Sequence, residues 1–177
     1  DQDQLILMDV SNIENPRELD RVQLDSEIRD IDFDGEQIAL GLGGNGVMLF
    51  VLDDDVLVEK DSARPPGSVF SLSLDRNYLW VGSWATTTLY AIQERGLLPI
   101  GQEEPAYSAM GVAASDGSAV VADWYQTTIL EQVPERWGAE LHLPKQMRFK
   151  QGQPDSQTIW VYNYGAEPLE INFTDLP

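Results

Sequence analysis

The sequence repeats itself every 41 residues, and this period restricts the folds open to the chain. Asp34, Asp75 and Asp116 stand 41 residues apart, and the segments around them align without gaps. In that alignment Ile38, Leu79 and Val120 coincide, as do Leu40, Val81 and Ala122. Leu5–Val10 matches the corresponding part of a preceding unit. A fixed period of this length is typical of repeat architectures.

Each unit reads as a series of short strands separated by turns. Aliphatic, aromatic and Thr residues fill the strands, and Gly, Asp and Asn mark the turns. The second strands of the units are expected at Gln37–Leu42, Tyr78–Ser83 and Ala119–Trp124. Apolar residues occupy both the odd and the even positions of these strands, which predicts that both faces of the sheet pack against other parts of the protein. We therefore predict an all-β fold of consecutive four-stranded β-propeller blades over residues 1–137.

The number of units is too small for a closed ring. Propellers close with about four to eight blades, whereas three matched units and the end of another are visible here. An open series of blades leaves sheet edges and faces unpaired. We expect an incomplete propeller that is closed by further blades N-terminal to Asp1, as the rest of a longer polypeptide, or by self-association.

Residues Leu5–Leu19 resemble the signature of LVIVD-repeat proteins. The match is carried by Leu5, Ile6, Asp9 and Val10, followed by Ser11, Asn12, Asn15 and Pro16. The later units keep the strand pattern but not the Asn-Pro turn. The resemblance, which extends from about Leu5 to Val133, implies a β-propeller with an extracellular, cell-surface or periplasmic location.

The spacing changes after Val133, and residues 138–177 have two interpretations. They can form a degenerate last blade, with strands at Met147–Lys150 and Thr158–Tyr162. They also resemble the start of a Hydin-like immunoglobulin-type domain, because Val161, Asn163 and Gly165 precede Pro168, Leu169 and Ile171 in the order of that motif. The second interpretation implies the N-terminal strands of a β-sandwich.

Composition excludes several classes of function. Eleven Lys and Arg against 30 Asp and Glu give a net charge of −19, which disfavours nucleic-acid partners. No apolar run reaches the roughly 18 residues of a membrane span. With no Cys, one His (His142) and no nucleophile motif, catalytic groups are scarce. A non-enzymatic binding module is the first hypothesis. The alternative is a propeller enzyme, a metal-assisted hydrolase or lyase using Asp30, Asp32 and Asp123, with missing blades completing its site.

Two acidic clusters suggest metal binding at first sight. Asp30, Asp32 and Asp34 match the start of an EF-hand loop, but its twelfth position is Gly41 instead of Glu. A strand with alternating carboxylates is the first interpretation, and a calcium site is the alternative. Asp53–Asp55 is expected to be a solvated turn. The GxGxxG pattern at 41–46 precedes a strand, and a dinucleotide site needs a helix there, so we expect a tight turn.

The aromatic residues near the predicted turns are the main candidates for a binding site. Trp84 and Tyr125 occupy equivalent positions in the ungapped alignment. In a propeller, the turn after the second strand shares a face with the connections between blades. That face would carry Arg64, Trp84, Tyr107, Asp123, Trp124 and Tyr125. Such a rim suits a protein or carbohydrate ligand. The alternative is that these rings fill the gaps between blades.

Overall fold

The structure, a computed structural model, describes residues 3–105, 107–132, 139–142 and 160–163. The chain divides into two compact units, Asp1–Gln132 and Val133–Pro177, and the domain boundary expected at 137 stays a prediction. Within the described part, one short 3₁₀ helix, Gly43–Asn45, is the only helical element, and no helix is long and apolar enough to cross a membrane. The predicted all-β class is confirmed. The strands of the first unit are β1 (Gln4–Asp9), β2 (Arg17–Gln23), β3 (Asp30–Phe33), β4 (Gln37–Gly41), β5 (Val47–Asp53), β6 (Val56–Ala63), β7 (Val69–Asp75), β8 (Tyr78–Ser83), β9 (Thr87–Gln93), β10 (Gly96–Glu103), β11 (Gly111–Ser115), β12 (Ser118–Ala122) and β13 (Thr127–Glu131).

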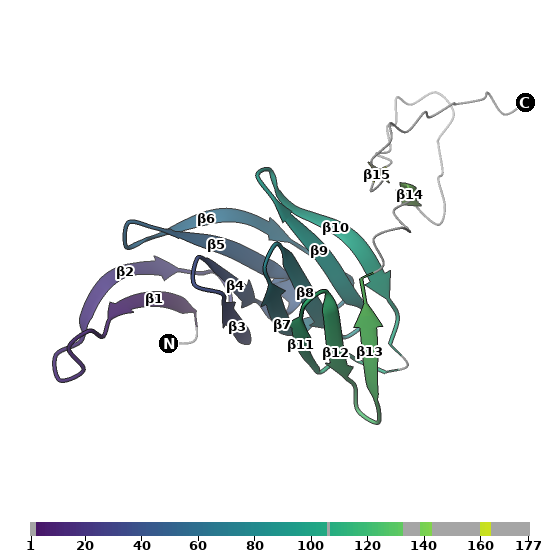
Figure 1. Ribbon diagram of the computed structural model, residues 1–177, viewed down its shortest axis with the longest axis horizontal. Helices are drawn as coiled ribbons and strands as arrows, with labels where there is room; N and C mark the ends of the chain where they lie inside the picture. Colours follow the sequence, from purple (N-terminus) through teal and green to yellow (C-terminus); the bar gives the residue numbers. More distant parts are fainter. Residues whose placement is uncertain (1–2, 106, 133–138, 143–159, 164–177) are drawn as a thin grey trace, which may run out of the picture. The chain divides into compact units, whose positions relative to one another are not determined.

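The strands of the first unit form successive antiparallel sheets in chain order (Figure 1). Two sheets have four strands, β3-β4-β5-β6 and β7-β8-β9-β10. They are flanked by the two-stranded sheet β1-β2 and the three-stranded sheet β11-β12-β13. Consecutive strands pair as hairpins, and the connections lead from the last strand of one sheet to the first strand of the next. This is the blade pattern expected from the repeat.

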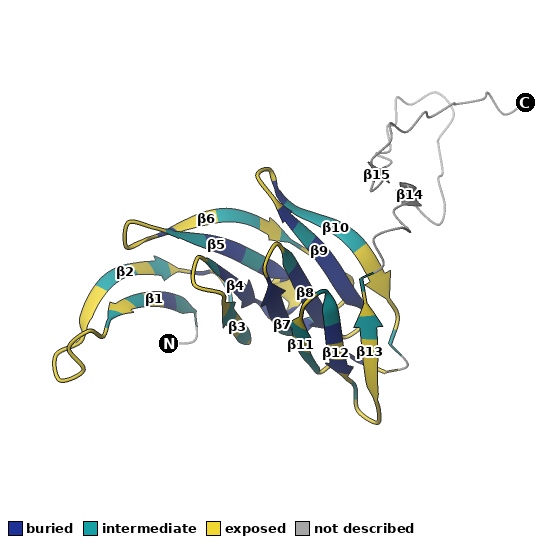
Figure 2. Ribbon diagram, viewed as in Figure 1, coloured by how far each residue is buried: buried dark blue, intermediate teal, exposed yellow. Residues whose placement is uncertain are grey.

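The core lies between the sheets and not within any one of them. Leu79 and Val81 on β8 pack against Ala39 and Leu49 of the preceding sheet. Trp80, the residue between them, faces the other way and packs against Ala119 of the following sheet. All three β8 side chains are buried, so the prediction of cover on both faces is confirmed. Figure 2 shows the buried residues concentrated on β4, β5, β7, β8 and β9.

The third unit is one residue out of step with the ungapped alignment. β7 and β8 end in the pair Asp75↔Tyr78, whereas β11 and β12 end in the pair Ser115↔Ser118. The equivalent residues are therefore 40 apart at this step, although they are 41 apart at the previous one. The match of Val120 with Leu79 is wrong, since Ala119 is the buried equivalent and Val120 is exposed. The step arises in the β8–β9 turn, where the Ser83 N–H donates to Thr86 O, because it is one residue shorter than the β4–β5 turn, where the Leu42 N–H donates to Gly46 O. Relative to the alignment, this one-residue change reverses the face that each later side chain occupies.

Carboxylates on the innermost strand β3 bind the backbone of the next sheet. Asp30 Oδ2 accepts a hydrogen bond of 2.8 Å from the Leu72 N–H, and Asp32 Oδ2 accepts one of 2.8 Å from the Leu74 N–H. Alternate strand residues point to the same side, so the two carboxylates act together. β7 is an edge strand of its own sheet. These bonds therefore satisfy donors that no strand of that sheet reaches.

The same link recurs at the next junction with hydroxyls in place of carboxylates. Ser71 and Ser73 stand 41 residues after the two aspartates. Ser71 Oγ accepts a bond of 3.2 Å from the Val112 N–H, and Ser73 Oγ accepts one of 3.1 Å from the Ala114 N–H. The 41-residue repeat thus encodes polar contacts between sheets as well as apolar ones.

A second row of links joins the outermost strands. Asp20 on β2 accepts a bond of 2.7 Å from the Leu57 N–H on β6, and Asp61 on β6 accepts one of 2.7 Å from the Leu97 N–H on β10. Gly96 precedes that donor with φ +118°, and a Cβ there would lie 2.0 Å from Asp61 Oδ2. A glycine is therefore required for the carboxylate to reach the backbone.

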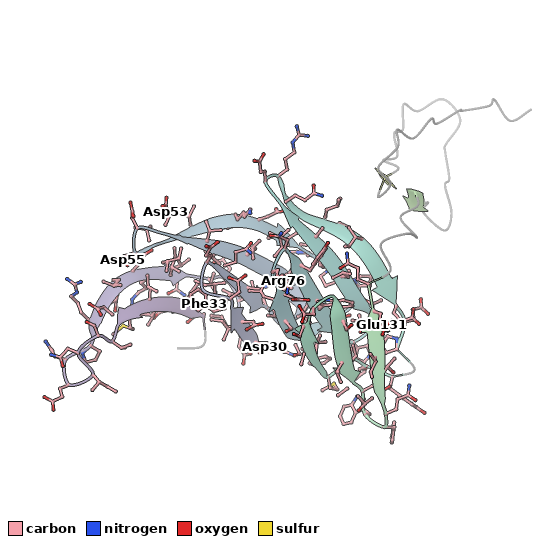
Figure 3. The ribbon with its side chains drawn as sticks, viewed as in Figure 1. Asp30, Phe33, Asp53, Asp55, Arg76 and Glu131 are labelled. Carbon is pink, nitrogen blue, oxygen red and sulfur yellow. The ribbon has the colours of Figure 1, made fainter. Side chains whose placement is uncertain are left out.

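Two turn predictions and one strand prediction are answered by the described residues. The 41–46 pattern forms the turn between β4 and β5, with the 3₁₀ helix inside it. Asp53–Asp55 lies exposed at the tip of the β5–β6 hairpin (Figure 3). In the second unit β14 (Ala139–His142) pairs with β15 (Trp160–Asn163), which overlaps the strand expected at 158–162. The strand expected at 147–150 lies outside the described residues, and the nature of 138–177 stays a prediction.

Candidate binding surface

Two turns of identical construction each present a tryptophan. In the β8–β9 turn, the Ser83 N–H donates to Thr86 O at 2.8 Å, and Ser83 Oγ accepts a bond of 3.0 Å from the Thr86 N–H. In the β12–β13 turn, the Asp123 N–H donates to Gln126 O at 3.0 Å, and Asp123 Oδ1 accepts a bond of 2.7 Å from the Gln126 N–H. The first side chain of each turn thus closes the turn, as Ser and Asp commonly do.

The residue after the closing side chain projects outward in both turns. Trp84 is 59% exposed and Trp124 is 60% exposed. The sequence equated Trp84 with Tyr125, and this equivalence is wrong by the same one-residue step that displaces Val120. The structural repeat therefore places an indole ring at the same turn position of two adjacent sheets.

The connection between β10 and β11 supplies the other walls of a groove. The Ala109 N–H donates to Ser83 O at 3.1 Å, which ties this connection to the β8–β9 turn. The Tyr107 ring meets the Tyr125 ring edge to face, with 4.6 Å between their centroids. The groove has a volume of about 470 Å³. It is lined by Trp84, Pro105, Tyr107, Ser108, Trp124 and Tyr125. We call it the aromatic groove.

A smaller pocket of about 190 Å³ adjoins the aromatic groove and shares Pro105 with it. Its charged members are all acidic, and its aliphatic members Val121 and Leu130 come from β12 and β13. Residues 123 and 126 of the β12–β13 turn face this pocket, whereas 124 and 125 face the groove. The pocket is lined by Thr87, Glu103, Glu104, Pro105, Val121, Asp123, Gln126, Thr128 and Leu130. We call it the acidic pocket.

One aromatic neighbour of the groove was missed from the sequence. The Phe70 ring lies 5.9 Å from the Trp84 ring, tilted by 50°, and the Arg29 guanidinium carbon lies 6.0 Å from the centre of the Phe70 ring. Phe70 lies on β7, in a run that reads as ordinary strand residues. Its position near the start of the strand, close to the turns that carry the other rings, was the one feature that could have indicated its place beside the groove.

The structure brings together five of the six predicted rim residues. Four of them line the aromatic groove, and Asp123 lines the acidic pocket beside it. Arg64 lines neither cavity. It is exposed in the connection between β6 and β7, where its backbone passes Gly46 of the neighbouring turn. That a ligand occupies this surface stays a prediction.

The carboxylates considered for calcium have backbone partners. Besides their bonds to β7, Asp30 and Asp32 accept bonds of 3.0 and 2.9 Å through Oδ1 from the N–H of the next residue. Asp34 Oδ1 accepts bonds from the Glu36 and Gln37 N–H groups at 3.0 and 2.8 Å, as in an Asp turn. Within the described part of the chain, no group of three or more His, Cys, Asp or Glu side chains has a metal-binding arrangement.

The candidate catalytic set of the enzyme alternative is divided between sheets. Asp30 and Asp32 lie on β3 and contact β7, whereas Asp123 lies in the β12–β13 turn and holds that turn closed. Figure 3 shows Asp30 on β3, at a distance from the Asp53–Asp55 tip of the same sheet. His142 lies on β14, in the second unit.

Comparisons with known proteins address the fold. No family model matches the sequence, and no curated protein matches it either. Among solved structures, the computationally designed Ika4 protein is similar with a TM-score of 0.57 and 14% identity, over 65% of this chain and 72% of Ika4. The WD40 β-propeller domain of Doa1 is similar with a TM-score of 0.54 and 16% identity, over 61% of this chain and 38% of that one. The stacked four-stranded sheets and this likeness together show an incomplete β-propeller.

Proposed function

We propose that this protein is a non-enzymatic binding module that holds a segment of a protein partner in the aromatic groove. The observation that carries the proposal is the pair of equivalent turns that expose Trp84 and Trp124, both of which line one groove. Exposing two indole rings to water costs free energy that a bound partner would recover. Tryptophan and tyrosine are also the side chains that most often dominate protein interfaces.

The alternative that these rings only pack between blades finds less support. Tyr107, Tyr125 and both tryptophans are each more than half exposed, whereas side chains between the sheets, such as Trp80, are buried. The groove rings therefore contribute little to the core of the described unit. Their residue types favour recognition, because rigid aromatic rings offer a large contact area at a small entropic cost.

We do not propose the metal-assisted hydrolase or lyase. Asp30 and Asp32, two of its three candidate groups, each use one carboxylate oxygen to hold the next sheet. Removing them would damage the scaffold whether or not they were catalytic. Loss of activity in such variants would therefore say nothing about chemistry.

An exported or cell-surface location, on a protein of the LVIVD-repeat type, also stays a proposal. Its support is the resemblance of residues 5–19 to that repeat. Protease treatment of intact cells that produce the natural protein tests it. An exported or displayed protein is degraded or found in the medium, and a protein that survives until the cells are lysed contradicts the proposal.

The binding function can be tested without knowing the partner. A displayed library of random dodecapeptides and a glycan array would be screened against the immobilised chain. Each hit would then be measured against the Trp84→Ala/Trp124→Ala variant. We expect peptide hits whose affinity falls at least about tenfold in that variant, as for central aromatic residues of an interface. Phe33→Ala, which removes an equally exposed ring from β3, is the matched control.

Three results would contradict the proposal. Glycan hits that depend on the tryptophans would replace a protein partner with a carbohydrate. Peptide hits that bind the double variant unchanged would place the binding site elsewhere. An absence of hits in both screens, with the chain shown to be folded by its circular dichroism melting curve, would favour packing as the role of the rings.

A further inference from the structure

The acidic pocket is lined by three carboxylates that take part in no ion pair of the described structure. Glu103 and Glu104 are exposed, Asp123 is half-buried, and all three line one pocket of about 190 Å³. The described ion pairs are Arg17–Asp9, Arg21–Glu18 and Arg76–Asp116, and none of them includes a pocket residue. Like charges gathered in a concave site raise its affinity for a cation.

The pocket suits an organic cation better than a metal ion. Its carboxylates are not among groups that could jointly hold a metal in the described part of the chain. They line a cavity that is also lined by the aliphatic side chains of Val121 and Leu130. A guanidinium group can donate several hydrogen bonds to separated carboxylates while its methylene stem lies on apolar side chains. Arginine is the residue that combines both properties.

The pocket and the aromatic groove can be occupied by one continuous chain. Pro105 lines both cavities, and the β12–β13 turn contributes residues to each. Neighbouring residues of an extended peptide lie about 3.3–3.6 Å apart. A peptide with an arginine in the pocket therefore places the next few residues against the four rings. Proline and aromatic residues are the types that pack on such surfaces.

We infer that the partner segment is a basic peptide in which an arginine lies within a few residues of a proline or aromatic residue. This inference rests on the proposed function, and it assigns the acidic pocket to the arginine and the aromatic groove to its neighbour. The net charge of −19 supports the same choice, because it attracts basic segments and repels acidic ones.

The test uses an arginine-containing peptide taken from the displayed library and its citrulline analogue. Citrulline keeps the shape of arginine and removes its charge. We expect citrulline to weaken binding about tenfold, and Glu103→Gln/Glu104→Gln to weaken binding of the arginine peptide by a similar factor. The matched control is Asp53→Asn/Asp54→Asn, which makes the same change in net charge at the β5–β6 tip. It should leave the affinity within about twofold, because distant exposed charges are screened by salt.

The outcomes separate this inference from the proposed function. If the hits depend on Trp84 and Trp124 but lack arginine, or bind equally as citrulline analogues, the inference is wrong and the proposed function stands. An equal loss in the two charge variants would show general attraction and not a pocket, which also overturns the inference. Hits that ignore the tryptophans overturn the proposed function itself.

Discussion

The strands β3 and β7 are the first strands of consecutive four-stranded sheets, yet their side chains differ in exposure to water. Leu72 and Leu74 on β7 are 4% and 8% exposed. Their equivalents on β3, Ile31 and Phe33, are 51% and 52% exposed. The residue types are alike, so the difference comes from the neighbour. β7 lies against β3, whereas the sheet before β3 consists in the described part of β1 and β2 alone.

The backbone shows the same contrast. The N–H groups of Leu72 and Leu74 donate to carboxylates of the preceding sheet. Those of Ile31 and Phe33 donate to the carboxylates of Asp30 and Asp32, within their own strand. Both strands therefore have the residues needed to pack against the first strand of a preceding sheet. Of the two, only β7 has such a neighbour among the described strands, namely β3. Further blades or a second copy of the chain, as expected from the sequence, would place such a strand before β3. This closure stays a prediction.

The largest effect is expected from truncating the covered member of an equivalent pair. Leu72→Ala should lower the free energy of unfolding by about 2–5 kcal/mol, because it leaves a cavity between two sheets. Ile31→Ala should lower it by less than about 1 kcal/mol, since the side chain is half in water. Urea unfolding of both variants, with matching m-values, measures the difference. Equal costs would show that β3 is covered in solution, and light scattering would tell whether a second copy covers it.

An intermediate effect is expected where the sheets are joined by side-chain acceptors. Asp32→Ala leaves the buried Leu74 N–H without an acceptor and should cost about 1–3 kcal/mol. Ser73→Ala removes a neutral acceptor from the Ala114 N–H and should cost about 0.5–1.5 kcal/mol. Asp32→Asn keeps an acceptor oxygen and serves as control in the same denaturation experiment. A cost for Ser73→Ala above that for Asp32→Ala would contradict the greater strength of the charged link.

The smallest effect is expected at the exposed turns of the same two sheets. Arg76 in the β7–β8 turn pairs with Asp116 in the β11–β12 turn, and both side chains are 77% exposed. Arg76→Ala should change the free energy of unfolding by less than about 1 kcal/mol, because water and salt screen such pairs. Alanine leaves the strain of the positive φ at this position in place. Thermal melts at low and high salt would measure this change in stability. A loss of more than about 1 kcal/mol would mean that the ion pair helps to align the two sheets.

The sequence predicted the sheets well and their polar contacts poorly. Period, turn residues and apolar strands depend on local chemistry, so the four-stranded units could be recognised. The one-residue step in the β8–β9 turn was missed because Ala119, Val120 and Val121 fit either face of a strand. That step displaced the tryptophan equivalence. The role of Asp30 and Asp32 was hidden for another reason, since the donors that they satisfy belong to a strand 42 residues away.

The side-chain links between inner strands give the stack a direction. The first four-stranded sheet offers the side-chain oxygens of Asp30 and Asp32 to N–H donors of β7, and the second offers those of Ser71 and Ser73 to N–H donors of β11. The register puts Gly111 and Ala113 at the next two acceptor positions, and neither has an oxygen in its side chain. A sheet stacked beyond β11 would therefore find a side-chain acceptor in this row only at Ser115, the equivalent of Asp75, which accepts a bond of 2.6 Å from the Gly117 N–H. Such a junction would have fewer side-chain links than either of the two junctions described, and we expect it to separate first under strain.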